Sequence, residues 1–161
     1  MKKIWALHES IKGKCLEFYH PLQELSIDER MVKSKARTHF RQYIRNKPTQ
    51  WGFKYWDVAD PTGYTLDVDL YCGKQRTVPL SSHGVSYDVT MERTKPFRFQ
   101  AYLVFLDNFY TTSPDLAAPL KEHAIGTLKT TRQGIPDKVK TLAQALNRSD
   151  VPRGIGYYVY A

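Results

Sequence analysis

Two aspartates stand at the ends of short apolar segments and are the first candidates for chemistry in this chain. Asp107 comes directly after the continuous apolar run from Tyr102 to Leu106. Such a run predicts a strand buried on both faces of an α/β fold, and α/β sheets bind ligands at the carboxyl ends of their strands. Asp28 has a similar setting, at the outer end of a short strand predicted over residues 25–29. The alternative is that each aspartate only leads its strand into a turn.

A basic segment that follows Asp28 is the second candidate site. It interleaves the cations Lys33, Lys35, Arg37, Arg41, Arg45 and Lys47 with His39, Phe40 and Tyr43. Cations of this kind bind a phosphate backbone and aromatic rings stack on bases. We therefore expect DNA contacts from Arg37, Arg41, Lys47 and Lys54. The alternative is a solvated loop whose charges contact only water.

The composition is that of one globular domain with an anionic partner. The chain has 161 residues, of which 42% are hydrophobic and 13% aromatic, enough for one core and too few for two domains. A net charge of +8 favours a polyanion as the partner. Cys15 and Cys72 are too few and too far apart for a disulfide scaffold or a zinc module, which indicates a reducing compartment.

No segment of the sequence approaches the roughly 20 apolar residues of a membrane span. The start, Met1-Lys2-Lys3, is not followed by an apolar signal region. We therefore expect an intracellular protein that does not enter a membrane.

Several elements have clear local signals. Apolar residues at helical spacing predict a helix that Pro21 closes, with a core-facing stripe of Ile4, Leu7, Ile11, Cys15 and Phe18. Residues 51–59 and 64–71 predict a hairpin around the turn Asp60-Pro61-Thr62-Gly63. Strict alternation in its second strand puts Asp67 and Asp69 on an exposed face, which argues against a metal site there. Lys54 and Asp57 are expected to be exposed in the same way.

The remaining elements are read from shorter patterns. Residues 84–92 fit a strand or a helix, and β-branching at Val85 and Val89 favours the strand. Ser113-Pro114-Asp115 predicts a helix start, with Pro119 kinking or ending the helix. Further elements are a strand over residues 124–128, a helix over 137–146 and a strand over 156–160. No repeat or linker divides residues 1–161, so they form a single domain.

Eight motifs, taken in order, resemble those of piggyBac-like transposases. They are Leu25-Ser-Ile-Asp-Glu-Arg-Met-Val32, Tyr43-Ile-Arg-Asn-Lys-Pro48, Trp51-Gly-Phe-Lys54, Thr62-Gly-Tyr64, Tyr71-Cys-Gly-Lys74, Asp107-Asn-Phe-Tyr-Thr-Thr112, Gly126-Thr127 and Gly134-Ile-Pro136. The resemblance implies an α/β, ribonuclease H-like mixed sheet with flanking helices, truncated at its C-terminal end. It implies that the strand bearing Asp28 lies beside the strand bearing Asp107, and that residues 84–92 are a short helix.

The resemblance also implies cutting and joining of DNA by three acidic residues that hold two divalent metals. Asp28 matches the first catalytic and metal-binding aspartate of the family and Asp107 matches the second. Two ions about 3.5–4 Å apart activate the attacking oxygen and stabilise the leaving one. Mg²⁺ is the expected cofactor because it requires hard oxygen ligands.

The third aspartate of the family has no match in this chain. Asp137 and Asp150 lie in a different context, and Glu122 is expected to be a solvated charge. Two smaller departures are Ala36, where the family has Gly, and a compressed segment between Lys74 and Tyr102. We therefore expect a catalytic-domain fragment that is inactive alone.

Three further expectations complete the sequence analysis. A partner chain or a dimer is expected to complete the sheet beside residues 157–160, and a nuclear location is expected if the organism is a eukaryote. The alternative function is a repurposed DNA-binding module in which the aspartates are vestigial. An unrelated ribonuclease H-like nuclease is a third interpretation.

Overall fold

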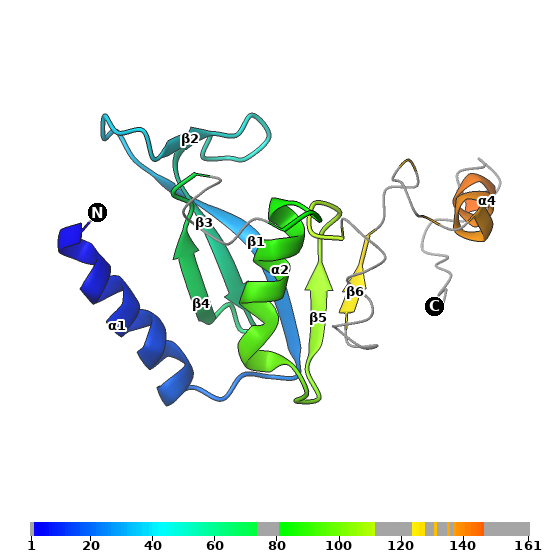
Figure 1. Cartoon of the computed structure of the whole chain (residues 1–161), viewed down its shortest axis with the longest axis horizontal. Helices are drawn as coiled ribbons and strands as arrows, with labels where there is room; N and C mark the ends of the chain where they lie inside the picture. Colours follow the sequence, from blue (N-terminus) through cyan, green and yellow to red (C-terminus); the bar gives the residue numbers. More distant parts are fainter. Residues whose placement is uncertain are drawn as a thin grey trace.

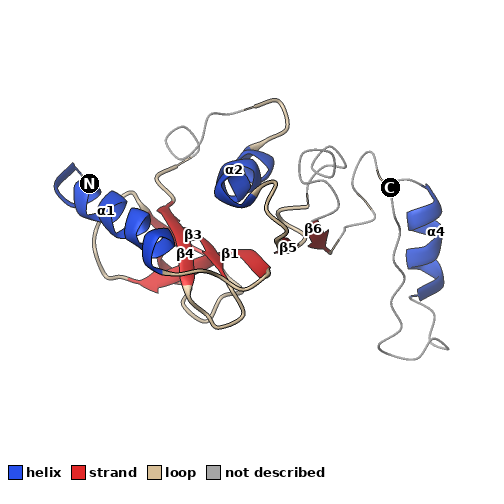
Figure 2. Ribbon diagram, turned by 90° about the horizontal axis from the view of Figure 1, so that it is seen from below, coloured by secondary structure: helices blue, strands red, loops and turns tan. Residues whose placement is uncertain are grey.

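Six strands form one mixed sheet, and helix α2 packs on one of its faces in this computed structural model (Figures 1 and 2). The structure describes residues 2–73, 81–111, 124–127, 131, 135 and 137–146. The described elements are α1 (Lys2–Phe18), β1 (Glu24–Lys33), β2 (Arg41–Tyr43), β3 (Trp51–Ala59), β4 (Thr65–Leu70), α2 (Val85–Thr94), the 3-10 turn η1 (Lys95–Phe97), β5 (Leu103–Leu106), β6 (Ala124–Gly126) and α4 (Asp137–Leu146).

The strand order places β1 between an antiparallel half and a parallel half of the sheet. On one side β1 pairs antiparallel with β3, whose far edge is shared by β2 and β4. On the other side β1 pairs parallel with β5, and β5 pairs parallel with β6. The strand that carries Asp28 therefore lies beside the strand that precedes Asp107, as the resemblance implies.

The core lies between the sheet and α2. Alternate residues of β1 and β3 point into it, and Val89 of α2 covers them with an exposed fraction of 0%. The buried cluster consists of Leu25, Ile27, Trp56, Val58, Leu66, Val89, Phe97, Val104, Leu106 and Tyr110. Residues 84–92, which periodicity alone assigned to a strand, thus form a helix, as the resemblance implies.

Two expectations about the strands around the aspartates are wrong in detail. β1 is ten residues long, so Asp28 lies in its middle and not at its outer end. β5 is not buried on both faces, because Phe105 is 41% exposed while Val104 and Leu106 are buried. A continuous apolar run therefore did not distinguish a strand covered on one face from a strand covered on both.

The predicted hairpin is confirmed, but the exposure of its acidic residues is not. β3 and β4 pair around the turn, in which the Gly63 N–H donates to the Asp60 carbonyl at 2.9 Å. Gly63 has φ +83°, a conformation that glycine adopts without strain. Asp67 and Asp69 are buried, with exposed fractions of 3% and 9%. They pair with Arg93 of α2, a partner that lies 26 residues beyond Asp67 and that strand alternation does not reveal.

Lys54 and Asp57 of β3 are also less exposed than expected. Both residues are half-buried. Asp57 pairs with Arg30 of the neighbouring strand at 2.6 Å, and burial raises the pKa of Asp57 despite this pair. Cross-strand ion pairing on the sheet surface explains why a polar side chain at an outward position is covered.

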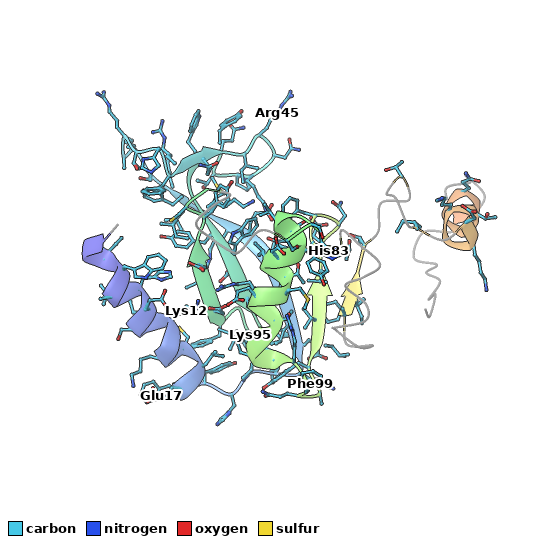
Figure 3. All side chains as sticks on the ribbon, viewed as in Figure 1. Lys12, Glu17, Arg45, His83, Lys95 and Phe99 are labelled. Atoms are coloured by element: carbon cyan, nitrogen blue, oxygen red, sulfur yellow. The ribbon has the colours of Figure 1, made fainter. Side chains whose placement is uncertain are left out.

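Helix α1 forms as predicted but packs through a different face. Ile4, Leu7, Ile11 and Phe18 are 52–76% exposed. The helix instead contacts β4 through Lys12, which points toward the sheet in Figure 3 and pairs with Asp67 at 3.3 Å. Helical spacing identified the helix, but its partly covered side chains are His8, Lys12, Cys15 and Leu16, so most of the apolar stripe lies on the exposed face.

The last part of the chain is described in pieces. α4 has the predicted bounds, and β6 (Ala124–Gly126) confirms the strand predicted over residues 124–128, which ends two residues earlier than expected. The helix predicted from Ser113 and the strand predicted over residues 156–160 lie outside the described residues. Among the helices that the structure describes, none is long and apolar enough to cross a membrane. Cys15 and Cys72 are not joined to each other by a disulfide bond.

Candidate metal and DNA site

The register of β1 and β5 brings Asp28 and Asp107 together. Ile27 pairs with Leu106 at the last position of this parallel ladder, and both side chains point into the core. Each aspartate is the next residue along, so strand alternation turns both away from the core, and both are exposed. Neighbouring strands lie about 4.8 Å apart. The two aspartates therefore stand at neighbouring positions of adjacent strands, where β5 ends and β1 continues.

Backbone and hydroxyl donors hold these carboxylates in place. The Glu29 N–H donates to Oδ1 of Asp28 at 2.7 Å. Oδ1 of Asp107 accepts from the N–H of Asn108 and from the Thr127 hydroxyl, at 3.4 Å for the hydroxyl. Thr127 follows β6, so three neighbouring strands contribute to the site. The second oxygen of each carboxylate is left to other partners.

Glu29 and Tyr110 belong to the same site, and Tyr110 was not singled out from the sequence. The Tyr110 hydroxyl donates to Oε2 of Glu29 at 3.1 Å, and Tyr110 is fully buried. Burial raises the pKa of Tyr110, and the negative charges of Glu29, Asp28 and Asp107 raise it further. This tyrosine lies three residues after Asp107, in a turn closed by its own N–H to the Asp107 carbonyl at 2.9 Å. Its place in the Asp107–Thr112 motif was the available signal.

Lys47 supplies a cation to the acidic residues. Its Nζ lies 3.6 Å from Oδ2 of Asp28 and 3.5 Å from Oε1 of Glu29, and it donates to the Glu29 carbonyl at 3.2 Å. Lys47 comes from the loop between β2 and β3, which bends back over β1. The lysine that the sequence assigned to DNA thus contacts Asp28, one of the two aspartates that it assigned to metal, and Glu29, which it did not assign.

Lys54 lies beside the same group, within a set of aromatic rings. Its Nζ is 3.9 Å from the centre of the Trp56 ring and 5.1 Å from that of Phe109. Burial lowers the pKa of Lys54, and the charge of Lys47 adds to this effect, whereas Glu29 and Asp28 oppose it. The aromatic contacts compensate part of the lost hydration of the ammonium group.

The environment also shifts the pKa of Asp28. Burial raises the pKa of Asp28, and the charge of Glu29 adds to this, whereas the Glu29 N–H and Lys47 lower it. Since 58% of the Asp28 side chain is exposed, solvent screens these interactions. The Asp28 carboxyl group is therefore accessible to a cation from solvent.

Arg37 and Arg41 are not brought to the carboxylates. Arg37 is exposed in the loop before β2, and Arg41 stacks on Trp51 with its guanidinium carbon 4.6 Å from the ring centre. Of the four cations predicted to contact DNA, Lys47 and Lys54 lie at the acidic site and the two arginines lie beyond the point where β1 ends.

The donor set fits a divalent cation only in part. Carboxylate oxygens are the ligands that Mg²⁺ prefers, and the Lys47 ammonium already pairs with two of the carboxylates. Within the part of the chain that the structure describes, no group of three or more His, Cys, Asp or Glu side chains is arranged to hold a metal ion. Among the described residues, Asp28 and Asp107 are thus not joined by a third possible ligand.

Comparisons with known proteins identify the family of the chain. Residues 1–158 match the family described as "Transposase IS4". Over 133 residues the chain is 28% identical to the Homo sapiens PiggyBac transposable element-derived protein 3, covering 79% of the chain and 22% of that protein. It is equally similar to the Homo sapiens Chimeric ERCC6-PGBD3 protein, of which it covers 12%.

A solved structure shows the same fold. The piggyBac transposase in a cryo-EM synaptic complex with hairpin DNA matches with a TM-score of 0.74 and 29% identity, over 94% of this chain and 30% of that one. The sheet is thus of the ribonuclease H-like type that the motifs implied. The chain spans less than a third of the length of each of these relatives. With its family match over nearly all residues, the chain belongs to the Transposase IS4 family and is of the piggyBac type.

Proposed function

We propose that this chain carries two of the carboxylates of a transposase metal site, Asp28 and Asp107, which serve in Mg²⁺-dependent DNA cleavage and strand transfer. The observation that carries the proposal is their adjacency at the end of the β1–β5 ladder. Bound Mg²⁺ would activate the attacking oxygen and neutralise charge on the phosphate. The solved relative in complex with hairpin DNA supports DNA as the partner.

Each neighbouring residue has a defined part in this proposal. The N–H groups of Glu29 and Asn108 hold one oxygen of each aspartate, which orients the other oxygen. Lys47 neutralises the acidic residues when no metal is bound and must leave Asp28 when a metal takes its place.

The chain alone is proposed to be inactive in DNA cleavage. Two carboxylates hold a divalent ion weakly, and catalysis by two metals in the family uses a third acidic residue. A nuclear location follows from this function if the organism is a eukaryote.

Metal binding tests the proposal most directly. Mn²⁺ titration, followed by calorimetry and by the electron paramagnetic resonance signal of the free ion, should show weak binding that Asp28→Asn and Asp107→Asn each abolish. Asp137→Asn is the matched control, because Asp137 is 94% exposed and pairs only with Lys140 in α4 among the described residues. Binding that survives both of the first two substitutions contradicts the proposal.

A DNA-binding module without catalysis is the second candidate function. It is favoured by Lys47, which neutralises the acidic residues without any metal, and by the exposed basic segment around Arg37 and Arg41. DNA affinity should then survive Asp28→Asn with Asp107→Asn. It should fall when Arg37, Arg41 and Lys47 are all changed to Gln, and the salt dependence should become less steep. DNA binding that does not depend on salt excludes this candidate.

A further inference from the structure

Two exposed aromatic rings lie side by side at one end of the sheet, away from the carboxylates. Tyr43 of β2 and Trp51 of β3 are direct cross-strand partners, with ring centres 4.9 Å apart. Tyr43 is 51% exposed and Trp51 is 50% exposed. Two adjacent aromatic side chains at this exposure present one contiguous flat apolar surface to solvent, and contiguous apolar patches mark binding sites on soluble proteins.

The backbone holds this pair in a fixed position. The Ile44 N–H donates to the Gln50 carbonyl at 2.9 Å, directly beyond the pair, and the Gln50 side chain donates to the Arg45 carbonyl at 3.0 Å. On the other side, Arg41 stacks on Trp51. The rings are thus placed by a short hairpin and one cation, which limits the entropy lost when a flat ligand stacks on them.

The charge around the pair identifies the ligand. Residues 33–50 contain six lysines and arginines and no aspartate or glutamate. Arg45, next to the pair in sequence, is exposed and extends away from the sheet in Figure 3. Aromatic rings surrounded by lysines and arginines bind single-stranded nucleic acid, since bases stack on the rings while cations contact the phosphates.

We propose that Tyr43, Trp51 and Arg41 form a stacking platform for unpaired bases of a DNA strand. A base in a duplex is already stacked on both faces, so the platform favours DNA whose strands are separated. Trp51 lies six residues along β3 from Asp57, the cross-strand partner of Asp28. At about 3.3 Å per residue, Trp51 and Asp57 are roughly 20 Å apart along the strand. This distance corresponds to about six nucleotides of DNA at 3.4 Å each.

The test measures binding without any divalent ion, so it does not depend on the proposed metal site. Fluorescence anisotropy compares a labelled 12-nucleotide oligo(dT) with a 12-base-pair duplex in EDTA. Trp51→Ala should weaken oligo(dT) binding about ten-fold, which corresponds to the loss of one stacked base. Trp51→Phe should keep most of the affinity, and duplex binding should change less than about two-fold. The matched control is Trp5→Ala, since Trp5 is a 42% exposed tryptophan on α1.

A second measurement uses the unchanged chain and covers the case in which Trp51→Ala does not fold. A 2-aminopurine base within the oligonucleotide should lose fluorescence when it stacks on the rings, and Tyr43→Ala should reduce this quenching. The proposal is overturned if quenching is absent, if Trp51→Ala weakens single-stranded and duplex DNA equally, or if Trp5→Ala has the same effect. Binding of an RNA of matched sequence more than ten-fold tighter than DNA overturns the assignment to DNA.

Discussion

Replacing Arg93 with methionine removes the cation that joins α2 to β4. Arg93 is 4% exposed, with Nη1 2.7 Å from Asp67 and Nη2 3.2 Å from Asp69. Arg93→Met leaves two buried carboxylates without their guanidinium partner, with the Lys12 ammonium 3.3 Å from Asp67. Breaking a buried ion pair from one side costs about 3–5 kcal/mol. For a chain of this size that lowers the melting temperature by roughly 10 °C.

The loss of stability caused by Arg93→Met should depend on pH. Burial raises the pKa of Asp69, although Arg93, Lys12 and His8 act to lower it. A carboxyl group whose pKa is raised on folding binds protons more tightly in the folded state, so its protonation stabilises that state as the pH falls. Without Arg93 the pKa of Asp69 rises further. The difference in the free energy of unfolding between Arg93→Met and the parent chain should therefore be largest at pH 7 and shrink toward pH 4.

Urea denaturation followed by tryptophan fluorescence, at several pH values, measures this difference. Glu92→Gln is the matched control on the same helix, because Glu92 is exposed. Adding Asp67→Asn and Asp69→Asn to Arg93→Met should recover stability, since no unpaired buried charge remains. A loss that is equal at pH 7 and pH 4, or that the two added substitutions deepen, refutes the reasoning.

Three further changes test single features of the chain. Gly52→Ala should lower the free energy of unfolding by about 2 kcal/mol in urea, because its Cβ would meet the Val32 backbone, with the carbonyl carbon at 2.8 Å. Gly13→Ala, with no atom within 4 Å, should instead raise it by up to about 1 kcal/mol in the same assay. Lys47→Met should tighten Mn²⁺ binding up to about five-fold by calorimetry, since the competing ammonium is gone; unchanged or weaker binding would show that Lys47 does not oppose the metal.

Elements with local causes could be predicted from the sequence. The turn at Asp60–Gly63 follows from the backbone preferences of its residues, and the hairpin follows from the turn. The bounds of α4 also agree, from Asp137 in its first turn to Leu146. In each case the deciding interaction joins residues that are close in sequence, so no knowledge of the rest of the fold was needed.

The wrong predictions of exposure concern residues whose burial depends on partners far away in the sequence. Alternation correctly gave β4 as a strand, but Arg93 and Lys12 enclose Asp67 from two helices and bury it. The same contacts hold α1 by the face that carries Lys12 and leave Ile4 and Leu7 exposed. Periodicity reports which side chains share a face of an element, and the identity of the partner determines which face is covered.

The carboxylate site combines both kinds of information. Each aspartate follows a buried apolar residue, which the sequence shows, and exposure on the outward face then follows from alternation alone. What brings the two together is the pairing of Ile27 with Leu106, across 79 residues, and periodicity does not contain that pairing. The motif order supplied it instead, because motifs that resemble a family carry the strand order of the family fold.

The contacts of Lys47 with the acidic residues could not be predicted from the sequence. The basic neighbours of Lys47 indicated phosphate, and only the loop that returns over β1 places its ammonium on Asp28 and Glu29. Under the proposed function, Lys47 pairs with the acidic residues in the free chain and contacts a phosphate once a metal displaces it, so the two assignments of Lys47 would describe successive states of one site.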